Sequence, residues 1–271
     1  ALAVPLFLVP KLGLVRGSFA VGLINAAGAL WCTYLLQHAL QRPSRVWLLR
    51  AEAFFSVAVM VLGLLFSEKL TRLAEDVMYS DPIVHAETTP YQRIVFTQGR
   101  TGLGLYLNGE LQLSSQDEHQ YHEALVHPVM TVARTRLVRD PERVLVLGGG
   151  DGLAVREILD HPSIEKVTLV DLDPAMTRLG KSFHPLVLKN ESSLSDARVE
   201  IINSDAMRWL SERAQKQTQD TLRYDVVVID FPDPSSYSLG KLYTTRFYGL
   251  VRGALEAQGA LVVQSTSPMY A

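Results

Sequence analysis

The sequence predicts an α/β protein whose main domain is doubly wound and Rossmann-like, with helices on both faces of a parallel sheet. Strand-like and helix-like segments alternate along the second half of the chain, which is typical of this architecture. The first of these strands runs directly into a glycine-rich turn and a helix-like segment, the order found where a sheet binds a nucleotide. The predicted strands cover residues 143–147, 167–171, 199–202, 225–229 and 260–264.

The N-terminal region predicts helices that span a membrane. The stretch 17–41 contains no Asp, Glu, Lys or Arg, and it exceeds the roughly 20 residues that a helix needs to cross a bilayer. A second stretch, 46–66, is also apolar, although Arg50 and Glu52 interrupt its first turns. Residues 1–10 resemble the end of a further span. Buried core helices of a soluble protein are the alternative explanation.

A linker and a small β-hairpin domain are predicted between the membrane region and the main domain. Residues 67–78 are polar and helix-like, and apolar residues alternate over 91–113 around Asn108-Gly109, a strong hairpin signal. A helix is expected over 115–138, with Ser115 as its N-cap in a capping box. The chain therefore divides into 1–67, transmembrane helices; 68–114, linker and β-strand subdomain; and 115–271, the Rossmann-like domain.

Composition narrows the class of function. The net charge is −2 and there is no basic tract, so nucleic-acid binding has little support. The single cysteine, Cys32, excludes an internal disulfide and fits a reducing compartment. Because the chain starts within an apolar run and stops at Ala271 just after a strand, we expect it to be truncated at both ends.

The glycine-rich turn contains Gly148, Gly150 and Gly152 in a G-x-G-x-G pattern. Glycines let the backbone turn tightly and approach a nucleotide, with the amides of a helix N-terminus facing it. A dinucleotide-binding loop would carry glycine at the position of Leu153, so the pattern favours the sulfonium nucleosides bound by class I methyltransferase-type folds. The carboxylate of Asp151, inside the loop, would repel a phosphate and attract a cation.

A carboxylate follows each of the first four predicted strands. In a doubly wound sheet ligands bind beyond the carboxyl ends of the strands, so these acids are expected to gather at one edge. Asp171 favours ribose binding, whereas Asp173, which precedes a proline, favours helix capping. Asp230 and Asp233 lie three residues apart on a proline-bearing turn and could chelate a metal or hold an amine, with turn formation as the plain alternative. The complete set is Asp151, Asp171, Asp173, Asp205, Asp230 and Asp233.

A cationic substrate explains these acids better than a metal does. The histidines His119, His122 and His127 offer pairs at helical spacing that could bind zinc, but the H-E-x-x-H pattern is absent, and no metal site is predicted. With a sulfonium nucleoside as donor and an alkyl amine as acceptor, the amine must lose a proton before it attacks, since its free pKa is about 10.4. A partly desolvated carboxylate can orient that amine and take the proton.

Together these motifs resemble the spermidine synthase (polyamine aminopropyltransferase) family over residues 91–264. The apolar N-terminus resembles the bacterial members that are fused behind membrane spans. The matching segments are Tyr91-Gln92, Leu107-Asn-Gly-Glu-Leu-Gln112, Asp117-Glu118 with Tyr121-His122-Glu123, Gly148 to Gly152, Asp171-Leu-Asp173, Asp205-Ala206 and Asp230-Phe-Pro-Asp233-Pro.

The resemblance implies transfer of an aminopropyl group from decarboxylated S-adenosylmethionine to a polyamine such as putrescine, giving spermidine and methylthioadenosine. Asp230 would act on the attacking amine, helped by Tyr121, and Asp151 would hold the propylamine of the donor. His122 and Asp233 would line the acceptor channel. The rest of the donor would contact Gln92, Gly148, Gly150, Gly152, Asp171, Asp205 and Ala206. No metal is implied.

The chain departs from the family's pattern in three places. Asp171 replaces the usual glutamate, the segment 235–241 replaces a Gly-Pro-rich one, and the last strands with one wall of the acceptor site are missing. The sequence therefore leaves the acceptor, and the activity of this chain in isolation, undetermined.

Two other functions fit parts of the pattern. An S-adenosylmethionine-dependent methyltransferase would share the glycines, Asp171 and Asp205, but it would not need Asp151 or the Asp230–Asp233 pair. A catalytically idle, membrane-tethered polyamine-binding protein would retain every acid. The expected location is the bacterial inner membrane, with several spans and the catalytic domain in the cytoplasm, and a homo-oligomer is compatible with the sequence.

Overall fold

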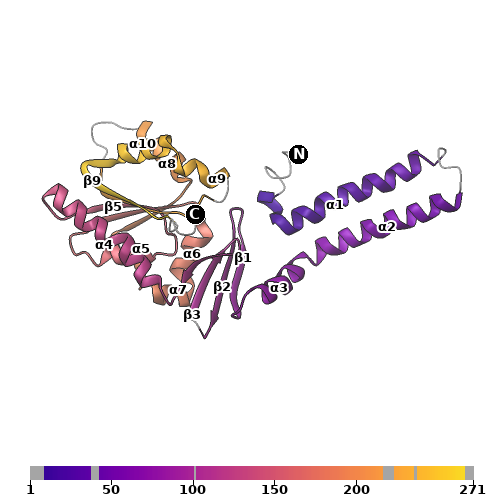
Figure 1. The fold of residues 1–271 in the computed structure, drawn as a ribbon, viewed down its shortest axis with the longest axis horizontal. Coiled ribbons are helices and arrows are strands. Elements are labelled where there is room, and N and C mark those ends of the chain that lie inside the picture. Colours follow the sequence, from indigo (N-terminus) through magenta and orange to yellow (C-terminus); the bar gives the residue numbers. More distant parts are fainter. Residues whose placement is uncertain (1–8, 38–42, 101, 216–222, 235–236, 266–271) are drawn as a thin grey trace. The chain divides into compact units, whose positions relative to one another are not determined.

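A computed structural model describes residues 9–37, 43–100, 102–215, 223–234 and 237–265 of the protein (Figure 1). The chain divides into two compact units, Ala1–Arg100 and Thr101–Ala271. The first unit contains three helices and one antiparallel pair of strands among its described residues, and the second contains the parallel sheet.

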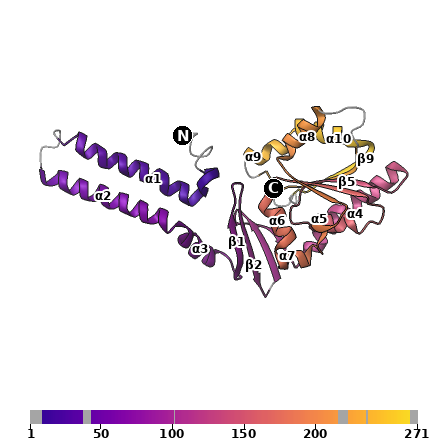
Figure 2. The ribbon, with the colours of Figure 1, turned by 180° about the vertical axis from the view of Figure 1, so that it is seen from behind.

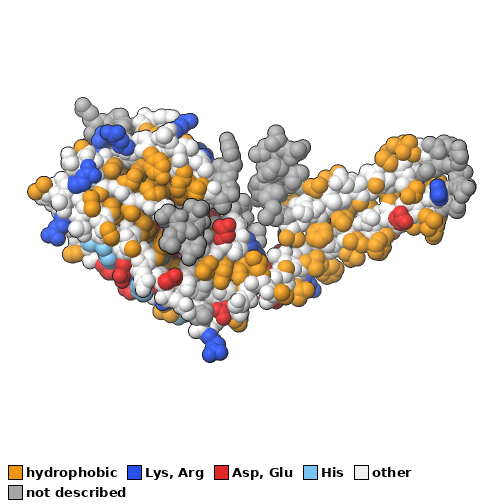
Figure 3. Space-filling view, viewed as in Figure 1, with side chains coloured by type: hydrophobic (Ala, Val, Ile, Leu, Met, Phe, Trp, Pro, Cys, Tyr) orange, Lys and Arg blue, Asp and Glu red, His pale blue; other side chains and the backbone are white. Residues whose placement is uncertain are grey.

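Two long helices, α1 (Val9–Leu35) and α2 (Pro43–Leu65), lie side by side in the first unit (Figures 1 and 2). Within them, the segments Val15–Leu35 and Arg45–Leu65 are long and apolar enough to cross a membrane, and their most apolar windows are not buried inside the protein. Figure 3 shows apolar side chains along the surface of both helices. The prediction of two apolar N-terminal helices is confirmed.

Glycines allow close packing of α1 against α2. A Cβ atom at Gly22 would lie 2.6 Å from the sulfur of Met60, and one at Gly63 would overlap the ring of Phe19. Small residues at such contacts let apolar helices approach each other. Gly28 has no described neighbour within 4 Å of the Cβ position, so it is not one of these contacts.

The third helix, α3 (Ser67–Met78), confirms the helix-like reading of this segment. Its nearly buried Glu75 accepts hydrogen bonds of 2.8 and 2.7 Å from the guanidinium of Arg93. Arg93 begins β2 (Arg93–Gly99), which pairs antiparallel with β1 (Ile83–Thr88). This bidentate ion pair therefore fixes α3 to the strands of its own unit.

The second unit begins with a β-hairpin. Strands β3 (Gly102–Leu107) and β4 (Glu110–Ser114) pair antiparallel. The turn residues Asn108 and Gly109 both have left-handed backbone angles, with φ of 54° and 87°. Two such residues match the twist of the flanking strands, so the hairpin predicted from Asn-Gly is confirmed.

Five parallel strands form the main sheet of this unit, in the order β7-β6-β5-β8-β9. The chain leaves β5 toward one edge and later returns to β8 on the other side of β5, so the strand order reverses there and marks the ligand-binding position of such sheets. All five predicted strands are present, although the last begins earlier than expected. Their bounds are β5 (Arg143–Gly148), β6 (Lys166–Asp171), β7 (Val199–Asn203), β8 (Tyr224–Asp230) and β9 (Leu255–Val263).

Helices cover both faces of the parallel sheet (Figure 1). On one face α4 (Glu118–Leu137) and α5 (Leu153–Leu159) pack against Val144 and Val146 of β5. On the other, α8 (Ala206–Gln215) and α10 (Thr245–Ala254) pack against Leu145 and Leu147. Because successive residues of β5 enter opposite cores, all four residues from Val144 to Leu147 are apolar. The doubly wound α/β prediction is confirmed.

Shorter helices connect these layers. The connecting helices are α6 (Pro174–Ser182), α7 (His184–Lys189), η2 (Ser193–Ser195), α9 (Tyr237–Gly240) and η3 (Lys241–Tyr243).

The helix expected over 115–138 begins later than predicted, and the capping-box prediction is wrong. Helix α4 starts at Glu118, and its N-cap Asp117 makes no side-chain capping bond. The Ser115 hydroxyl instead accepts a 2.9 Å hydrogen bond from the backbone N–H of Leu103. A tertiary hydrogen bond to β3 thus replaces the local one that the sequence suggested.

Candidate active site

The predicted acids lie at the carboxyl edge of the parallel sheet. Register pairs Gly148 with Asp230 and Asp171 with Asn203, so the ends of β5, β8, β6 and β7 are adjacent. Asp151 follows β5, and Asp205 follows β7. The topology therefore assembles on one rim the carboxylates that the sequence spreads over 80 residues.

The glycine loop folds tightly against Asp230. Gly148, Gly149 and Gly152 all have positive φ, of 83°, 67° and 86°. A Cβ atom at Gly149 would lie 3.1 Å from Oδ2 of Asp230. Gly149 is therefore a site residue that the sequence reasoning missed, and the run of three consecutive glycines was the available signal.

Asp171 joins the end of β6 to the glycine loop. Its Oδ2 accepts a 3.0 Å hydrogen bond from the N–H of Gly150, and its Oδ1 accepts one of 2.8 Å from the N–H of Asp173. Burial raises the pKa of Asp171 to about 6, against the effect of these two bonds. Asp173 accepts from Ala175 N–H at 3.0 Å and caps α6, which confirms its predicted capping role. Ribose binding by Asp171 stays a prediction.

Two polar side chains hold the backbone around Asp151. Asn190, fully buried, donates to the carbonyl of Asp151 at 2.7 Å and to that of Gly180 at 2.8 Å. Ser193 donates to the carbonyl of Gly152 at 2.7 Å. The Asp151 carboxylate accepts from the N–H of Leu153 at 2.9 Å. Neither Asn190 nor Ser193 lies in a recognisable motif, so sequence reasoning had no local signal for them.

Tyr121 and Asp230 meet directly. The Tyr121 hydroxyl donates a 2.7 Å hydrogen bond to Oδ1 of Asp230. Burial and the negative charge of Asp151 raise the pKa of Asp230, while His122 and Tyr121 oppose the rise. Desolvation and the charge of Asp230 raise the pKa of Tyr121, so the hydroxyl stays a donor. The result is a carboxylate whose proton affinity exceeds that of an ordinary aspartate.

His122 lies beside Tyr121 on α4, with the two rings nearly perpendicular and their centroids 4.6 Å apart. Its side chain is almost fully buried. Despite this burial, the hydrogen bond with Glu118 and the charges of Asp151 and Asp230 raise the pKa of His122. His122, which is predicted to line the channel of the polyamine acceptor, therefore interacts electrostatically with Asp151 and Asp230.

Asp205 makes two contacts at the start of α8. One carboxylate oxygen accepts a 3.0 Å hydrogen bond from the N–H of Arg208, and the other forms an ion pair with Lys241. These contacts outweigh burial and lower the pKa of Asp205. Ala206, the neighbouring predicted residue, is the buried first residue of α8. A ligand would have to bind Asp205 alongside or in place of Lys241.

Two further predicted site residues, Asp233 and Gln92, lie outside the contacts described above. Asp233 lies in the turn after β8, and burial of Tyr243, together with the charge of Asp233, raises the pKa of Tyr243 to about 12. Gln92 belongs to the first unit, at the turn before β2, so its role in the site stays a prediction. The segment 235–241 includes two residues, 235–236, that lie outside the described chain.

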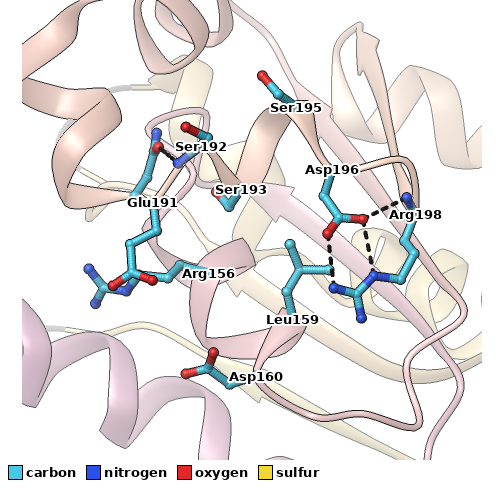
Figure 4. A pocket seen from close by; sticks show the side chains of 10 residues that line it. Arg156, Leu159, Asp160, Glu191, Ser192, Ser193, Ser195, Asp196 and Arg198 are labelled. Carbon is cyan, nitrogen blue, oxygen red and sulfur yellow. Dashed lines mark hydrogen bonds and ion pairs between the residues drawn. The ribbon is translucent and has the colours of Figure 1, made fainter.

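A cavity of about 340 Å³ lies elsewhere, lined by residues of α5 and of the segment from Asn190 to Arg198 (Figure 4). There the Arg198 guanidinium forms a bidentate pair with Asp196, at 3.0 and 2.9 Å. No predicted site residue lines this cavity. The carboxylates on the sheet rim, rather than this cavity, therefore form the candidate site.

The histidines considered as zinc ligands bind other partners. His119 and His122 contact Glu118, whereas His127 contacts His161 and Glu157. Among the described residues, no group of three or more His, Cys, Asp or Glu side chains is placed to hold a metal ion.

The second unit of the chain matches a known protein family. Residues 118–271 match the family of the spermine/spermidine synthase domain. The chain belongs to this family. The resemblance deduced from the motifs is therefore confirmed at the level of the family.

Named relatives of this synthase family match nearly the whole chain. A polyamine aminopropyltransferase of Leptospira interrogans is 46% identical over 267 residues, covering 98% of this chain and 51% of that protein. Polyamine aminopropyltransferase 2 of Ralstonia nicotianae is 44% identical over 272 residues, covering 100% of this chain and 51% of that protein. The chain spans about half the length of the curated relatives it matches.

Solved structures of the synthase family share the fold. A spermidine synthase in complex with the transition-state analogue AdoDATO aligns with a TM-score of 0.60 and 28% identity, over 69% of this chain and 59% of that one. The spermidine synthase of Thermotoga maritima aligns with a TM-score of 0.58 and 27% identity, over 69% of this chain and 58% of that one.

Proposed function

We propose that the protein transfers an aminopropyl group from decarboxylated S-adenosylmethionine to a polyamine such as putrescine, releasing methylthioadenosine. The observation that carries this proposal is the hydrogen bond from Tyr121 to Asp230 beside the glycine loop. Such a pair is suited to binding and deprotonating an amine next to a bound nucleoside. The names of the relatives, polyamine aminopropyltransferases, point to the same reaction.

The donor would bind along the rim. Asp151, in the loop after β5, would pair with the ammonium of the propylamine group, and its carboxylate would repel the extra carboxylate of ordinary S-adenosylmethionine. Asp171 would accept from the ribose hydroxyls and Asp205 from the adenine amino group. The backbone of Gly148, Gly150, Gly152 and Ala206 would border the nucleoside.

Asp230 would activate the acceptor. The attacking amine is protonated at neutral pH and cannot react until it loses that proton. Burial and Asp151 raise the pKa of Asp230, which suits a carboxylate to take the proton. Tyr121 binds Oδ1 and thereby orients the carboxylate, leaving Oδ2 for the amine, while His122 and Asp233 would line the path of the acceptor.

The bond changes then balance without a further reactant. The amine lone pair forms a bond to the propyl carbon that is attached to the sulfonium sulfur. The bond between this carbon and sulfur breaks, and its electron pair moves to sulfur. Neutral methylthioadenosine leaves, and the proton stays on Asp230 until solvent removes it. No metal takes part in the proposed reaction.

The proposal extends to the membrane and to the organisation of the chain. Residues 1–67 would anchor the protein in the bacterial inner membrane, and residues 115–271 would form the catalytic domain on the cytoplasmic side. The two apolar helices support the first part. The intracellular origin of the donor supports the second.

Calorimetry combined with product analysis tests the function. Purified protein in detergent is expected to bind decarboxylated S-adenosylmethionine more tightly than S-adenosylmethionine and to form spermidine from putrescine. Tighter binding of S-adenosylmethionine with methylated products would instead establish a methyltransferase. Binding of polyamine without turnover would indicate the catalytically idle alternative.

A further inference from the structure

The turn after β8 carries the two acids that are predicted to act on the acceptor. Asp230 is the last residue of β8, and its pairing with Gly148 of β5 fixes it in the parallel sheet. Asp233 lies beyond the sheet, at the end of the sequence Asp-Phe-Pro-Asp. Pro232 and Pro234 have no backbone N–H, so the turn has few donors of its own with which to hold its shape. Contacts from elsewhere in the chain are therefore needed to fix Asp233 relative to Asp230.

Two contacts with the segment that follows hold this turn in place. The buried ring of Phe231 packs against Phe247 of α10, with the ring centroids 5.9 Å apart. The hydroxyl of Tyr243, the last residue of η3, donates a 2.9 Å hydrogen bond to the backbone carbonyl of Pro232. This carbonyl belongs to the peptide bond that joins Pro232 to Asp233. The hydrogen bond therefore fixes the backbone from which the Asp233 side chain projects.

The surroundings of Tyr243 keep its hydroxyl a hydrogen-bond donor. The side chain is half-buried and packs against the apolar core on the α8 and α10 side of the sheet. Burial and, after it, the charge of Asp233 raise the pKa of Tyr243 to about 12, so the phenol keeps its proton at neutral pH. A carbonyl oxygen only accepts hydrogen bonds. A protonated hydroxyl is therefore the partner that the Pro232 carbonyl requires.

We propose that Tyr243 is a positioning residue for Asp233 and thereby sets the length of the diamine acceptor that the site binds. This inference rests on the proposed function, in which Asp230 takes the proton of the attacking amine and Asp233 lines the path of the acceptor. The Asp233 carboxylate attracts the ammonium at the far end of a diamine, so its distance from Asp230 decides which spacing of the two nitrogens fits. No motif in the sequence pointed to Tyr243, because its partner is a backbone carbonyl 11 positions away.

Tyr243→Phe tests the positioning role, with Tyr248→Phe as its matched control. Each removes one hydroxyl from a half-buried tyrosine that packs against the same core, but in the described part of the chain only the Tyr243 hydroxyl bonds to the turn. Tyr243→Phe is expected to raise KM for putrescine about three- to tenfold, the scale of one neutral hydrogen bond. Because β8 still holds Asp230, kcat should change little. Tyr248→Phe is expected to leave this KM unchanged, and equal KM effects of the two variants would overturn the proposal.

Diamines of different length separate positioning from general damage. Cadaverine is one methylene longer than putrescine, and in a fitted site one methylene is worth about tenfold or more in kcat/KM. Tyr243→Phe is expected to bring the kcat/KM values of the two diamines closer together by about threefold or more, because a loosened turn discriminates less between lengths. Tyr248→Phe should keep the wild-type ratio. An equal loss for both diamines in Tyr243→Phe would assign this residue a purely structural role and overturn the proposal.

A double-mutant cycle tests whether Tyr243 acts through Asp233. Asp233→Asn removes the charge that is proposed to attract the far ammonium. Adding Tyr243→Phe to that background is expected to change KM for putrescine by less than about twofold, since the two residues act as one unit. A full additional loss would overturn the role through Asp233.

Binding can also be measured without turnover. Calorimetry in the presence of methylthioadenosine, which has no group to transfer, is expected to show putrescine binding to Tyr243→Phe several-fold more weakly than to the wild type and to Tyr248→Phe. Equal affinities of the three proteins for putrescine would overturn this inference even if aminopropyl transfer occurs. Absence of transfer with the difference in affinity present would instead refute the proposed function.

Discussion

The hydroxyl of Tyr121 donates a 2.7 Å hydrogen bond to Oδ1 of Asp230, and the two residues lie 109 positions apart in the chain. Tyr121 comes from the first turns of α4, and Asp230 is the last residue of β8. The bond therefore joins a helix covering one face of the sheet to the sheet's carboxyl edge. It leaves the second carboxylate oxygen of Asp230 beside the glycine loop.

Asp230→Asn is expected to reduce turnover by roughly 100-fold or more, because an amide cannot take the proton of the attacking amine. Donor affinity should be unchanged, since the carboxylate acts on the acceptor. Steady-state kinetics and calorimetry measure the two quantities. The milder Tyr121→Phe keeps the ring but loses the hydrogen bond, and should reduce turnover less. Full activity in Asp230→Asn would refute the proposed proton acceptor.

Asp151→Ala is expected to weaken binding of decarboxylated S-adenosylmethionine by about 1.5–3 kcal/mol, the scale of a hydrogen bond to a charged group. Methylthioadenosine lacks the amine, so its affinity should barely change. Calorimetry with both ligands makes the comparison within one variant. Equal losses for the two would mean that Asp151 only shapes the loop.

Gly149→Ala is expected to lower both stability and turnover. Its φ of 67° disfavours any side chain, and the added Cβ would lie 3.1 Å from the Asp230 carboxylate. A cost of about 1–2 kcal/mol in unfolding free energy follows from the left-handed backbone alone. Gly249→Ala is the matched control, since Gly249 lies in α10 with no described atom within 4 Å of its Cβ position. Equal changes in unfolding free energy and turnover for the two substitutions would contradict the role given to Gly149.

The stability of the second unit is expected to fall as pH rises from 4 to 7, through the contribution of Asp171. Burial raises the pKa of this carboxyl from 3.8 to about 6. When folding raises the pKa of a carboxyl, that group stabilises the folded state at pH values below its pKa in the unfolded chain. This stabilisation is lost as the pH rises through its pKa in the folded protein. Chemical unfolding followed by Trp209 fluorescence should show a shallower pH dependence in Asp171→Asn. An unchanged slope would exclude Asp171 as the cause.

The N-terminal helices are expected to hold the protein in a membrane. Residues Val15–Leu35 and Arg45–Leu65 meet the length and hydropathy of spanning helices. Carbonate washing of membranes should leave the protein in the pellet, and its recovery in the soluble fraction would contradict this. Protease added to sealed cells should spare residues 115–271, whereas their digestion from outside would reverse the proposed orientation.

The sequence alone was sufficient to predict the fold and most of the acidic residues at the carboxyl edge of the sheet. Alternating strand and helix patterns are local, and a doubly wound sheet necessarily brings the carboxyl ends of its strands to one edge. The sequence pattern by itself therefore places Asp151, Asp171, Asp205 and Asp230 together. Each follows a segment that the sequence pattern identifies as a strand.

Other features depended on contacts between distant segments, which a local pattern does not encode. Ser115 looked like a helix cap, yet its hydroxyl accepts from Leu103 of a neighbouring strand. Asn190 supports the Asp151 backbone from 39 positions away, and Glu118 meets Arg156 across two helices. Buried polar groups must find partners wherever the packed chain provides them. The sequence thus determined which acids line the rim, while only the tertiary structure decided which side chains orient them.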